Sequence, residues 1–188
     1  MPPKVKITKN DIIGAALELV RAEGADALNA RRIAMSLGCS TQPIFSNFSS
    51  MEELDDAVTK AAHEHYLGFL KKEAEKGEFS PYKSFGMAYM RFAKEEKELF
   101  KLLFMCDRGG KAIPPTADFE ASVQMITDSC GLSREKATLM HLEMWVAVHG
   151  IGTMLATSFL ELDWDVISTI TTDIYQGVRA RHMSEEGK

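Results

Sequence analysis

The sequence predicts an all-α protein, with a three-helix head at the N-terminus followed by a larger helical-bundle body. Apolar residues recur at helical spacing in almost every segment, and no stretch alternates long enough to predict a strand. The chain has 188 residues, 45% of them hydrophobic, which is enough to bury a core in one domain or two small ones. We expect the head to be a domain of residues 1–51 and the body a domain of residues 52–188.

The first predicted helix covers residues 9–23 and ends at Gly24, a residue that readily adopts the conformation that closes a helix. Its apolar face is expected to carry Ile13, Ala16, Leu17 and Val20. Lys4, Lys6 and Lys9 precede or begin this helix. They suit contact with a phosphate backbone, and they are equally typical of a solvated basic chain end.

Residues 30–48 follow the pattern of a short helix, a glycine turn and a second short helix. Asn29 is expected to cap the first short helix, which runs to Leu37. Ser40 is expected to cap the second, with Pro43 in its first turn, where a missing N–H does no harm. This is the plan of a helix-turn-helix, whose second helix enters the major groove of DNA.

Three residues are expected to set the packing of this segment. Ala34 is small where two helices cross closely, Gly38 allows the tight turn, and Ile44 anchors the third helix on the second. Ile33, Leu37 and Phe48 are expected to complete a miniature core. Short helices joined by glycine are common, so the spacing alone leaves a purely structural role open.

The body is predicted to begin with a long helix over residues 52–76, whose acidic first turn suits the positive end of the helix dipole. Later helices are expected after Pro81, around Phe119, after Ser133 and after Asp163, with a glycine- and proline-rich loop over residues 107–115. The helix after Ser133 is expected to present Leu142, Trp145, Val146 and His149 on one face, and the last helix to direct Ile167, Ile170, Ile174 and Val178 inward. The tail from Arg181 is expected to fray.

Charge is divided unevenly along the chain. Residues 1–51 hold six basic and four acidic side chains, whereas residues 52–188 hold 16 and 23. A weakly positive head on an acidic body suits a small nucleic-acid-binding module joined to a part that does not touch nucleic acid.

The sequence also indicates the compartment. The three cysteines are far apart and odd in number, and no apolar stretch of signal-peptide length follows the N-terminus, which predicts a reducing, cytoplasmic setting. The longest uncharged run, residues 144–160, is shorter than the roughly 20 apolar residues of a membrane-spanning helix. We therefore expect a buried helix there and no contact with a membrane.

Residues 9–58 resemble the TetR family of transcriptional regulators in order and spacing. The matching motifs are Leu28-Asn29-Ala30-Arg31-Arg32-Ile33-Ala34, Leu37-Gly38-Cys39-Ser40, Phe45-Ser46-Asn47-Phe48 and Met51-Glu52-Glu53-Leu54. The resemblance implies a dimer that binds double-stranded operator DNA, acts as a repressor, and responds to a small-molecule effector. Its expected DNA-binding residues are Lys9, Asn29, Arg31, Ser40, Thr41, Gln42, Phe45, Ser46 and Asn47.

The recognition segment departs from the family pattern at four positions. Phe45 stands where the family usually has a tyrosine that reaches a phosphate, and Met51 where it often has a lysine. Ser46 stands where the family often has an aromatic or basic residue, and Asn47 stands where it often has a histidine. Because phosphate contacts supply much of the affinity for DNA, we expect weaker or more selective binding than is usual in the family. Gln42 and Asn47 remain candidates for bidentate pairing with adenine, and Thr41 for contact with a phosphate or a thymine methyl group.

In the body, Trp145-Val146-Ala147-Val148-His149-Gly150 resembles the Trp-x-x-x-His-Gly signature of one subgroup of TetR C-terminal domains. Trp145 and His149 are four residues apart, so both rings should lie on one helix face. The expected effector is a small, largely apolar molecule in a pocket lined by Tyr66, Phe85, Tyr89, Phe92, Phe104, Met105, Met140, Met144, Trp145 and His149. Each of these residues is also suited to an ordinary core position.

Two other classes of protein compete with this interpretation. An enzyme is disfavoured, because the chain has no Gly-x-Ser-x-Gly, P-loop or His-Glu-x-x-His motif. His63 and His65 are two residues apart and should point away from each other on a helix, so we expect no metal site and no cofactor. A helical ligand-binding or protein-interaction module that has lost DNA binding is the second alternative.

Overall fold

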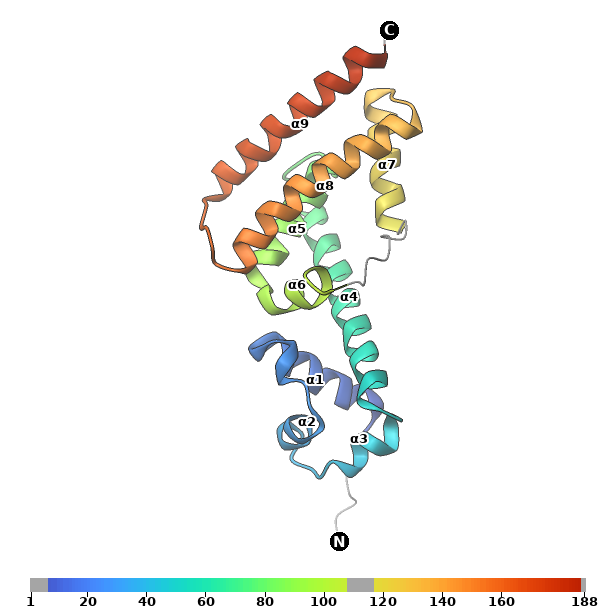
Figure 1. Cartoon of the computed structure of the whole chain (residues 1–188), viewed down its shortest axis with the longest axis vertical. Coiled ribbons are helices and arrows are strands. Elements are labelled where there is room, and N and C mark those ends of the chain that lie inside the picture. Colours follow the sequence, from blue (N-terminus) through green and yellow to red (C-terminus); the bar gives the residue numbers. More distant parts are fainter. Residues whose placement is uncertain (1–6, 108–116, 187–188) are drawn as a thin grey trace. The chain divides into compact units, whose positions relative to one another are not determined.

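The computed structural model describes residues 7–107 and 117–186, and within these ranges the regular structure is helical throughout (Figure 1). The elements are α1 (Lys9–Glu23), the 3-10 turn η1 (Ala25–Ala27), α2 (Ala30–Ser36), α3 (Gln42–Asn47), α4 (Met51–Glu75), α5 (Pro81–Glu95), α6 (Lys97–Phe104), α7 (Ala117–Cys130), α8 (Arg134–Ala156) and α9 (Trp164–Glu186). The all-α prediction is confirmed. Lys4, Lys6 and most of the expected loop over residues 107–115 lie outside the described residues.

The chain forms two compact units. Unit 1 contains residues up to Gly68 together with Glu96–Cys106, and unit 2 contains Phe69–Glu95 and the residues from Asp107 onward. The packing therefore differs from a simple division at residue 51, because α6 packs on α1 and the first part of α4 belongs with the head helices. Glu96, which is buried at the start of α6, pairs with Arg21 of α1 and joins the two segments.

The first helix of unit 1 begins with a reciprocal cap. The Thr8 hydroxyl accepts a hydrogen bond from the Asp11 amide, and the Asp11 carboxylate accepts one from the Thr8 amide, so two backbone N–H groups at the helix start are satisfied. The helix ends at Gly24, whose φ of +87° few other residues tolerate. Its buried face consists of Ile12, Ala16 and Val20, so the expected face is confirmed in part but centred on Ile12 rather than Ile13.

The predicted core of the helix-turn-helix is confirmed except at Leu37, which is half-buried. Ile33, Ala34, Ile44 and Phe48 are buried. Gly38 has a φ of +64°, which allows the turn after α2. Asn29 caps α2 by accepting from the Arg32 amide at 3.0 Å. The predicted cap at Ser40 is wrong: α3 starts one residue later, Thr41 is its N-cap residue, and its side chain makes no capping hydrogen bond.

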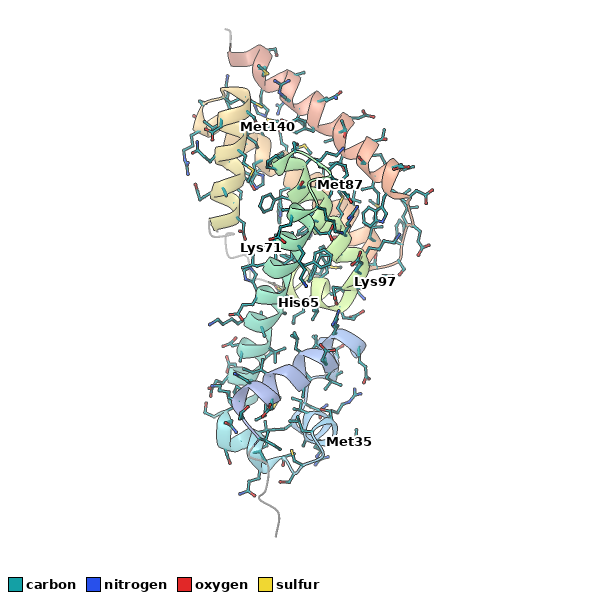
Figure 2. The ribbon with its side chains drawn as sticks, turned by 180° about the vertical axis from the view of Figure 1, so that it is seen from behind. Met35, His65, Lys71, Met87, Lys97 and Met140 are labelled. Carbon is teal, nitrogen blue, oxygen red and sulfur yellow. The ribbon has the colours of Figure 1, made fainter. Side chains whose placement is uncertain are left out.

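Unit 2 is built around α8, against which α5, α7 and α9 pack. Val123 and Ile126 of α7, Leu132 of the following turn, and Ala137 and Met140 of α8 form a buried cluster. Figure 2 labels Met140 of α8 and Met87 of α5, which both lie in the interior of this unit. Ser133 caps α8 as predicted, by accepting from the Lys136 amide.

The buried face of α8 differs from the face that was expected to carry Leu142, Trp145, Val146 and His149. The buried residues include Met140, Met144, Val148, Ile151 and Leu155, whereas Leu142 and Val146 are exposed. Trp145 and His149 lie at the edge of the buried face and are half-buried. This long helix is apolar around much of its circumference, so the sequence pattern did not specify which side would be covered.

The expected fraying of the tail from Arg181 is also wrong, because α9 continues to Glu186. His182 is buried on this last turn, and its Nε2 lies 3.0 Å from a carboxylate oxygen of Glu143 on α8. Arg181 pairs with the same carboxylate. Of the four residues expected to face inward on α9, Ile167 is fully buried and Ile170, Ile174 and Val178 are half-buried.

Within residues 7–107 and 117–186, no helix has both the length and the apolar character needed to cross a membrane.

Candidate nucleic-acid interface and effector site

A surface depression lies between the N-terminal ends of α2 and α3 in unit 1. Asn29, Ala30 and Arg31 line it from α2 and its cap, and Thr41 and Phe45 line it from α3 and its cap. Four of these five residues are among the DNA-binding residues expected from the sequence. The fold therefore brings the two segments of the helix-turn-helix together at one face.

Three of the expected DNA-reading amides and hydroxyls are bonded to the backbone of their own segment. Ser46 donates its hydroxyl to the Gln42 carbonyl at 2.8 Å, and Asn47 donates its amide to the Pro43 carbonyl at 2.8 Å. Both polar atoms of the Asn29 side chain are hydrogen-bonded: the oxygen accepts from the Arg32 amide as the cap of α2, and the nitrogen donates to the Ala27 carbonyl. These groups can contact DNA only through their remaining hydrogen-bonding capacity or by breaking a local bond.

Lys9 is held by the head as well. Its Nζ lies 2.8 Å from Glu53 and 4.5 Å from the centre of the Phe48 ring. Glu53 also accepts from the amide and hydroxyl of Ser49. The hydrogen bonds from Lys9 and Ser49 lower the pKa of Glu53 to about 2, so this carboxylate is charged at neutral pH and pairs with the lysine.

The remaining expected residues present their side chains to solvent. Arg31, Ser40, Gln42 and Phe45 are exposed, and Thr41 is half-buried. Among the described residues, the Arg31 guanidinium has no ion-pair partner. The face therefore offers one uncommitted cation, one uncommitted amide and an apolar ring.

In unit 2, the predicted pairing of Trp145 and His149 on one face of α8 is confirmed. Their rings stack, with centroids 5.3 Å apart and planes inclined by 18°. The hydroxyl of Tyr89 on α5 is hydrogen-bonded to Nδ1 of His149 at 2.8 Å. Burial lowers the pKa of His149, so the ring is neutral at physiological pH.

A second tyrosine–histidine pair of the same kind lies two helical turns away. The Tyr82 hydroxyl is 3.0 Å from Nδ1 of His141, and Phe119 of α7 packs edge-on against the same imidazole at 4.7 Å. Burial lowers the pKa of His141 to about 4 and raises that of Tyr82. The sequence analysis missed this pair. Tyr82 and Tyr89, like His141 and His149, are about two helical turns apart, and this spacing could have indicated two equivalent contacts between the helices.

The other expected ligand-lining residues are divided between the two units. Tyr66 and Phe104 pack against each other in unit 1, with ring centroids 5.1 Å apart, and Met105 of the same unit is exposed. In unit 2, Phe92 is fully buried against Phe69, and Met140 belongs to the buried cluster described above. Met144 is buried, and Phe85 is half-buried.

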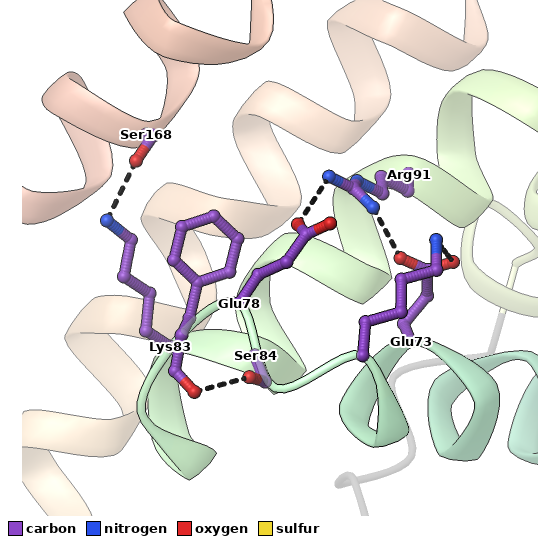
Figure 3. Close-up of polar contacts among 8 residues, drawn as sticks. Glu73, Glu78, Lys83, Ser84, Arg91 and Ser168 are labelled. Carbon is purple, nitrogen blue, oxygen red and sulfur yellow. Dashed lines mark hydrogen bonds and ion pairs between the residues drawn. The ribbon is translucent and has the colours of Figure 1, made fainter.

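Polar contacts join the helices that surround this part of unit 2 (Figure 3). Lys83 of α5 donates to Ser168 at 2.8 Å and to Thr172 at 2.9 Å, both on α9. Arg91 of α5 pairs with Glu73 at 2.6 Å and with Glu78 at 2.9 Å. These bonds fix α5, the helix that carries both tyrosines.

The histidines of α4 do not form a metal site among the described residues. The Nε2 atom of His65 lies 3.3 Å from Glu96, and the His63 ring lies 6.0 Å from that of Tyr66. The two histidines thus have different neighbours, as their spacing predicts.

Two family models match the chain. One, described as bacterial regulatory proteins of the tetR family, covers residues 12–58, and the other, described as tetracyclin repressor-like, C-terminal domain, covers residues 82–172. The first includes the helix-turn-helix and the second both tyrosine–histidine pairs. Together the two models describe the N-terminal and C-terminal domains of one family, and they cover most of the chain.

Known proteins are similar to this chain over most of its length. An HTH-type transcriptional regulator from Mycobacterium tuberculosis is 24% identical over 169 residues, which is 87% of this chain and 78% of the relative. A structure from Rhodococcus sp. RHA1 has a TM-score of 0.71 at 19% identity, covering 94% of this chain and 97% of that one. A putative TetR-family regulator from Vibrio parahaemolyticus has a TM-score of 0.64 at 14% identity, covering 89% and 96%. With its helix-turn-helix head and all-helical body, the chain belongs to the TetR family of transcriptional regulators.

Proposed function

We propose that this regulator binds operator DNA as a homodimer and that a small, largely apolar effector controls its affinity for the operator. The observation that carries the proposal is the juxtaposition of α2 and α3 residues at one exposed face of unit 1. In a helix-turn-helix, this face approaches the major groove. The residues 1–51 and 52–188 would then act as the DNA-binding and the sensing and dimerising parts.

Gln42 is the strongest candidate for reading a base. It is exposed at the first position of α3, and a glutamine amide can pair bidentately with adenine. Asn47, the other amide expected to do so, is bonded to the Pro43 carbonyl. We therefore expect Gln42→Ala to reduce discrimination between operator and random DNA by about 1–3 kcal/mol, and Asn47→Ala to reduce it less.

A selection of bound sequences from a random duplex pool tests the proposal directly. The intact protein should enrich a two-part site whose half-sites are separated by about one helical turn or a multiple, roughly 34–36 Å per turn. Binding should weaken steeply as salt is raised. Failure to enrich any sequence would instead favour a helical module that has lost DNA binding.

The proposed dimer surface lies on α8 and α9. The exposed apolar residues there are Leu139, Leu142, Val146, Val166 and Met183. Val146 is the most exposed of these residues, at 64%, and it lies in the middle of a 23-residue helix. Val146→Glu should convert the dimer to a monomer in light scattering, whereas Lys71→Glu, a charge change on the exposed side of α4, should not. A wild-type protein that is monomeric at micromolar concentration would contradict the dimer.

The proposed effector site in unit 2 centres on Tyr89, Trp145 and His149. The stacked pair offers a flat apolar surface, and the neutral imidazole and the phenol supply a few polar groups, which is the usual composition of a small-molecule site. We also propose that Trp145, His149 and Gly150 represent the Trp-x-x-x-His-Gly subgroup of the family.

Helix α4 is the proposed link between effector and operator. It is continuous from Met51 to Glu75, it buries Leu54 and Val58 in unit 1, and it contributes Phe69 and Leu70 to unit 2. An effector that binds better to one orientation of this helix than to another shifts the equilibrium between them, typically by about 1–3 kcal/mol of coupling.

Filling the site tests this link. His149→Trp should change operator affinity or abolish the response to an effector found by thermal-shift screening, whereas Glu135→Gln on the exposed first turn of α8 should do neither. Operator titrations of both variants, with and without the effector, provide the measurement. An unchanged affinity and an intact response in His149→Trp would remove this face of α8 from the sensing mechanism.

A further inference from the structure

The recognition helix of this regulator presents an apolar ring in place of a polar phosphate contact. Phe45 is 55% exposed, whereas its neighbours Ile44 and Phe48 are buried and hold α3 against the head. The exposure of Phe45 is therefore not a consequence of a loosely packed helix. The fixed helix directs this ring to the outside of unit 1.

The surroundings of Phe45 indicate what the ring contacts. Thr41 is one turn earlier in the chain, and it lines the same depression as Phe45 and Arg31. Thr41 is the N-cap residue of α3, yet its side chain makes no capping hydrogen bond. Thr41 and Phe45 are four residues apart and line one depression, on the face that the proposed function assigns to DNA.

The polar chemistry of this face is sparse. Lys9 is engaged by Glu53, and the side chains of Ser46 and Asn47 are bonded to carbonyls of their own helix. A phenylalanine ring has no hydrogen to donate to a phosphate. In the major groove, the group that an apolar side chain recognises is the C5 methyl of thymine.

We propose that Phe45, assisted by the methyl group of Thr41, is a specificity-determining residue that reads thymine methyl groups in the operator half-site. The inference rests on the proposed function, since it requires α3 to face the major groove. It adds an apolar contact to the base contact expected of Gln42, because Ser46 and Asn47 of the same helix are bonded to carbonyls of that helix.

Replacing thymine by deoxyuridine tests the inference, because deoxyuridine lacks only the C5 methyl group and keeps the base pair and its hydrogen-bonding groups. Each thymine of the selected operator is replaced in turn, and the dissociation constant is measured by fluorescence anisotropy. Wild-type protein should lose affinity by about fourfold at one or two positions in each half-site, the factor expected for one methyl-sized apolar group that is no longer buried. Thymines outside the site should show no change.

Variants then assign the effect to the ring. Phe45→Ala should bind thymine and deoxyuridine operators equally, whereas Phe45→Tyr, which keeps the ring, should retain the difference. Met35→Ala is the matched control, since Met35 is a 75% exposed apolar residue of the same unit that does not line the depression (Figure 2), and it should also retain the difference. Circular dichroism spectra and thermal melting of the three variants establish that the head remains folded.

The outcomes separate this inference from the proposed function. Specific operator binding that is insensitive to deoxyuridine at every position, or that stays equally sensitive in Phe45→Ala, overturns the role of Phe45 and leaves the regulator proposal intact. Absence of any specific duplex binding by the wild-type protein overturns both.

Discussion

The short helices of unit 1 and the long helices of unit 2 use their polar side chains in different ways. In unit 1, α2 and α3 have seven and six residues, and Asn29, Ser46 and Asn47 all bond to backbone groups close by in the chain. In unit 2, Tyr82 and Tyr89 bond to side chains about 60 residues away on a 23-residue helix.

Helix length accounts for the difference. Every α-helix leaves about four N–H groups and four carbonyls without intrahelical partners, so a six-residue helix consists almost entirely of ends. Nearby polar side chains satisfy part of that need in the head. A long helix satisfies most of its backbone internally, which leaves its polar side chains available to join one helix to another or to meet a ligand.

The largest effect should come from the core of unit 2. Phe92 is fully buried and its ring lies 5.4 Å from that of Phe69, so Phe92→Ala should lower the free energy of unfolding by about 3–5 kcal/mol. Phe45→Ala makes the same truncation at an exposed position and should change the free energy of unfolding by less than about 0.5 kcal/mol. Urea unfolding of both variants gives the comparison, and equal losses would contradict the assigned burial of the two rings.

The second effect concerns pH. The folded-state pKa of His141 is lowered from 6.5 to about 4, so acid protonates this residue in the unfolded chain first. Its contribution to stability is therefore present above pH 6.5 and is lost as the pH falls toward 4. His141→Gln places a side chain there that does not titrate. Between pH 7 and pH 4.5, the free energy of unfolding of this variant should fall by about 1–2 kcal/mol less than that of the wild-type protein, after allowance for partial solvent screening. Parallel pH dependences would show that His141 is not held neutral.

The third effect tests the caps of the head. Asn29 accepts from the Arg32 amide, so Asn29→Ala should destabilise unit 1 by about 1 kcal/mol. Ser40→Ala should have little effect, because α3 starts after Thr41 rather than after Ser40. Thermal unfolding of the two variants provides the measurement. A larger loss of stability in Ser40→Ala than in Asn29→Ala would indicate that Ser40 does cap α3, as expected from the sequence.

The smallest effect should come from a single interhelical hydroxyl. Tyr89→Phe removes the hydrogen bond to His149 and should lower stability by about 0.5–1.5 kcal/mol. Tyr175→Phe is the matched control, since the Tyr175 hydroxyl lies 3.8 Å from the Cys130 sulfur, a weak contact that should contribute less. Equal losses in the two variants would argue against a special role for the tyrosine–histidine pairs.

Local patterns in the sequence were enough to predict the helical class, the positions of most helices and the helix-turn-helix. These features depend on interactions between residues close in the sequence. Gly24 and Gly38 adopt positive φ, Asn29 caps α2, and Ile33 and Ile44 are apolar where two short helices must pack. A strong local preference needs no knowledge of distant parts of the chain, which is why the boundaries of α1 and α4 are predicted within a residue.

Three features depend on long-range packing: which side of α8 is buried, the packing of α6 with the head, and the contact between Tyr82 and His141. A helix that is apolar on several sides has no preferred face until its neighbours are in place, so Val146 could not be told from Val148 by periodicity. The engagement of Lys9 by Glu53, 44 residues away, likewise depends on how the chain folds back. Side-chain partners at such separations are fixed by packing, because the free energy of a single polar contact is too small to specify them alone.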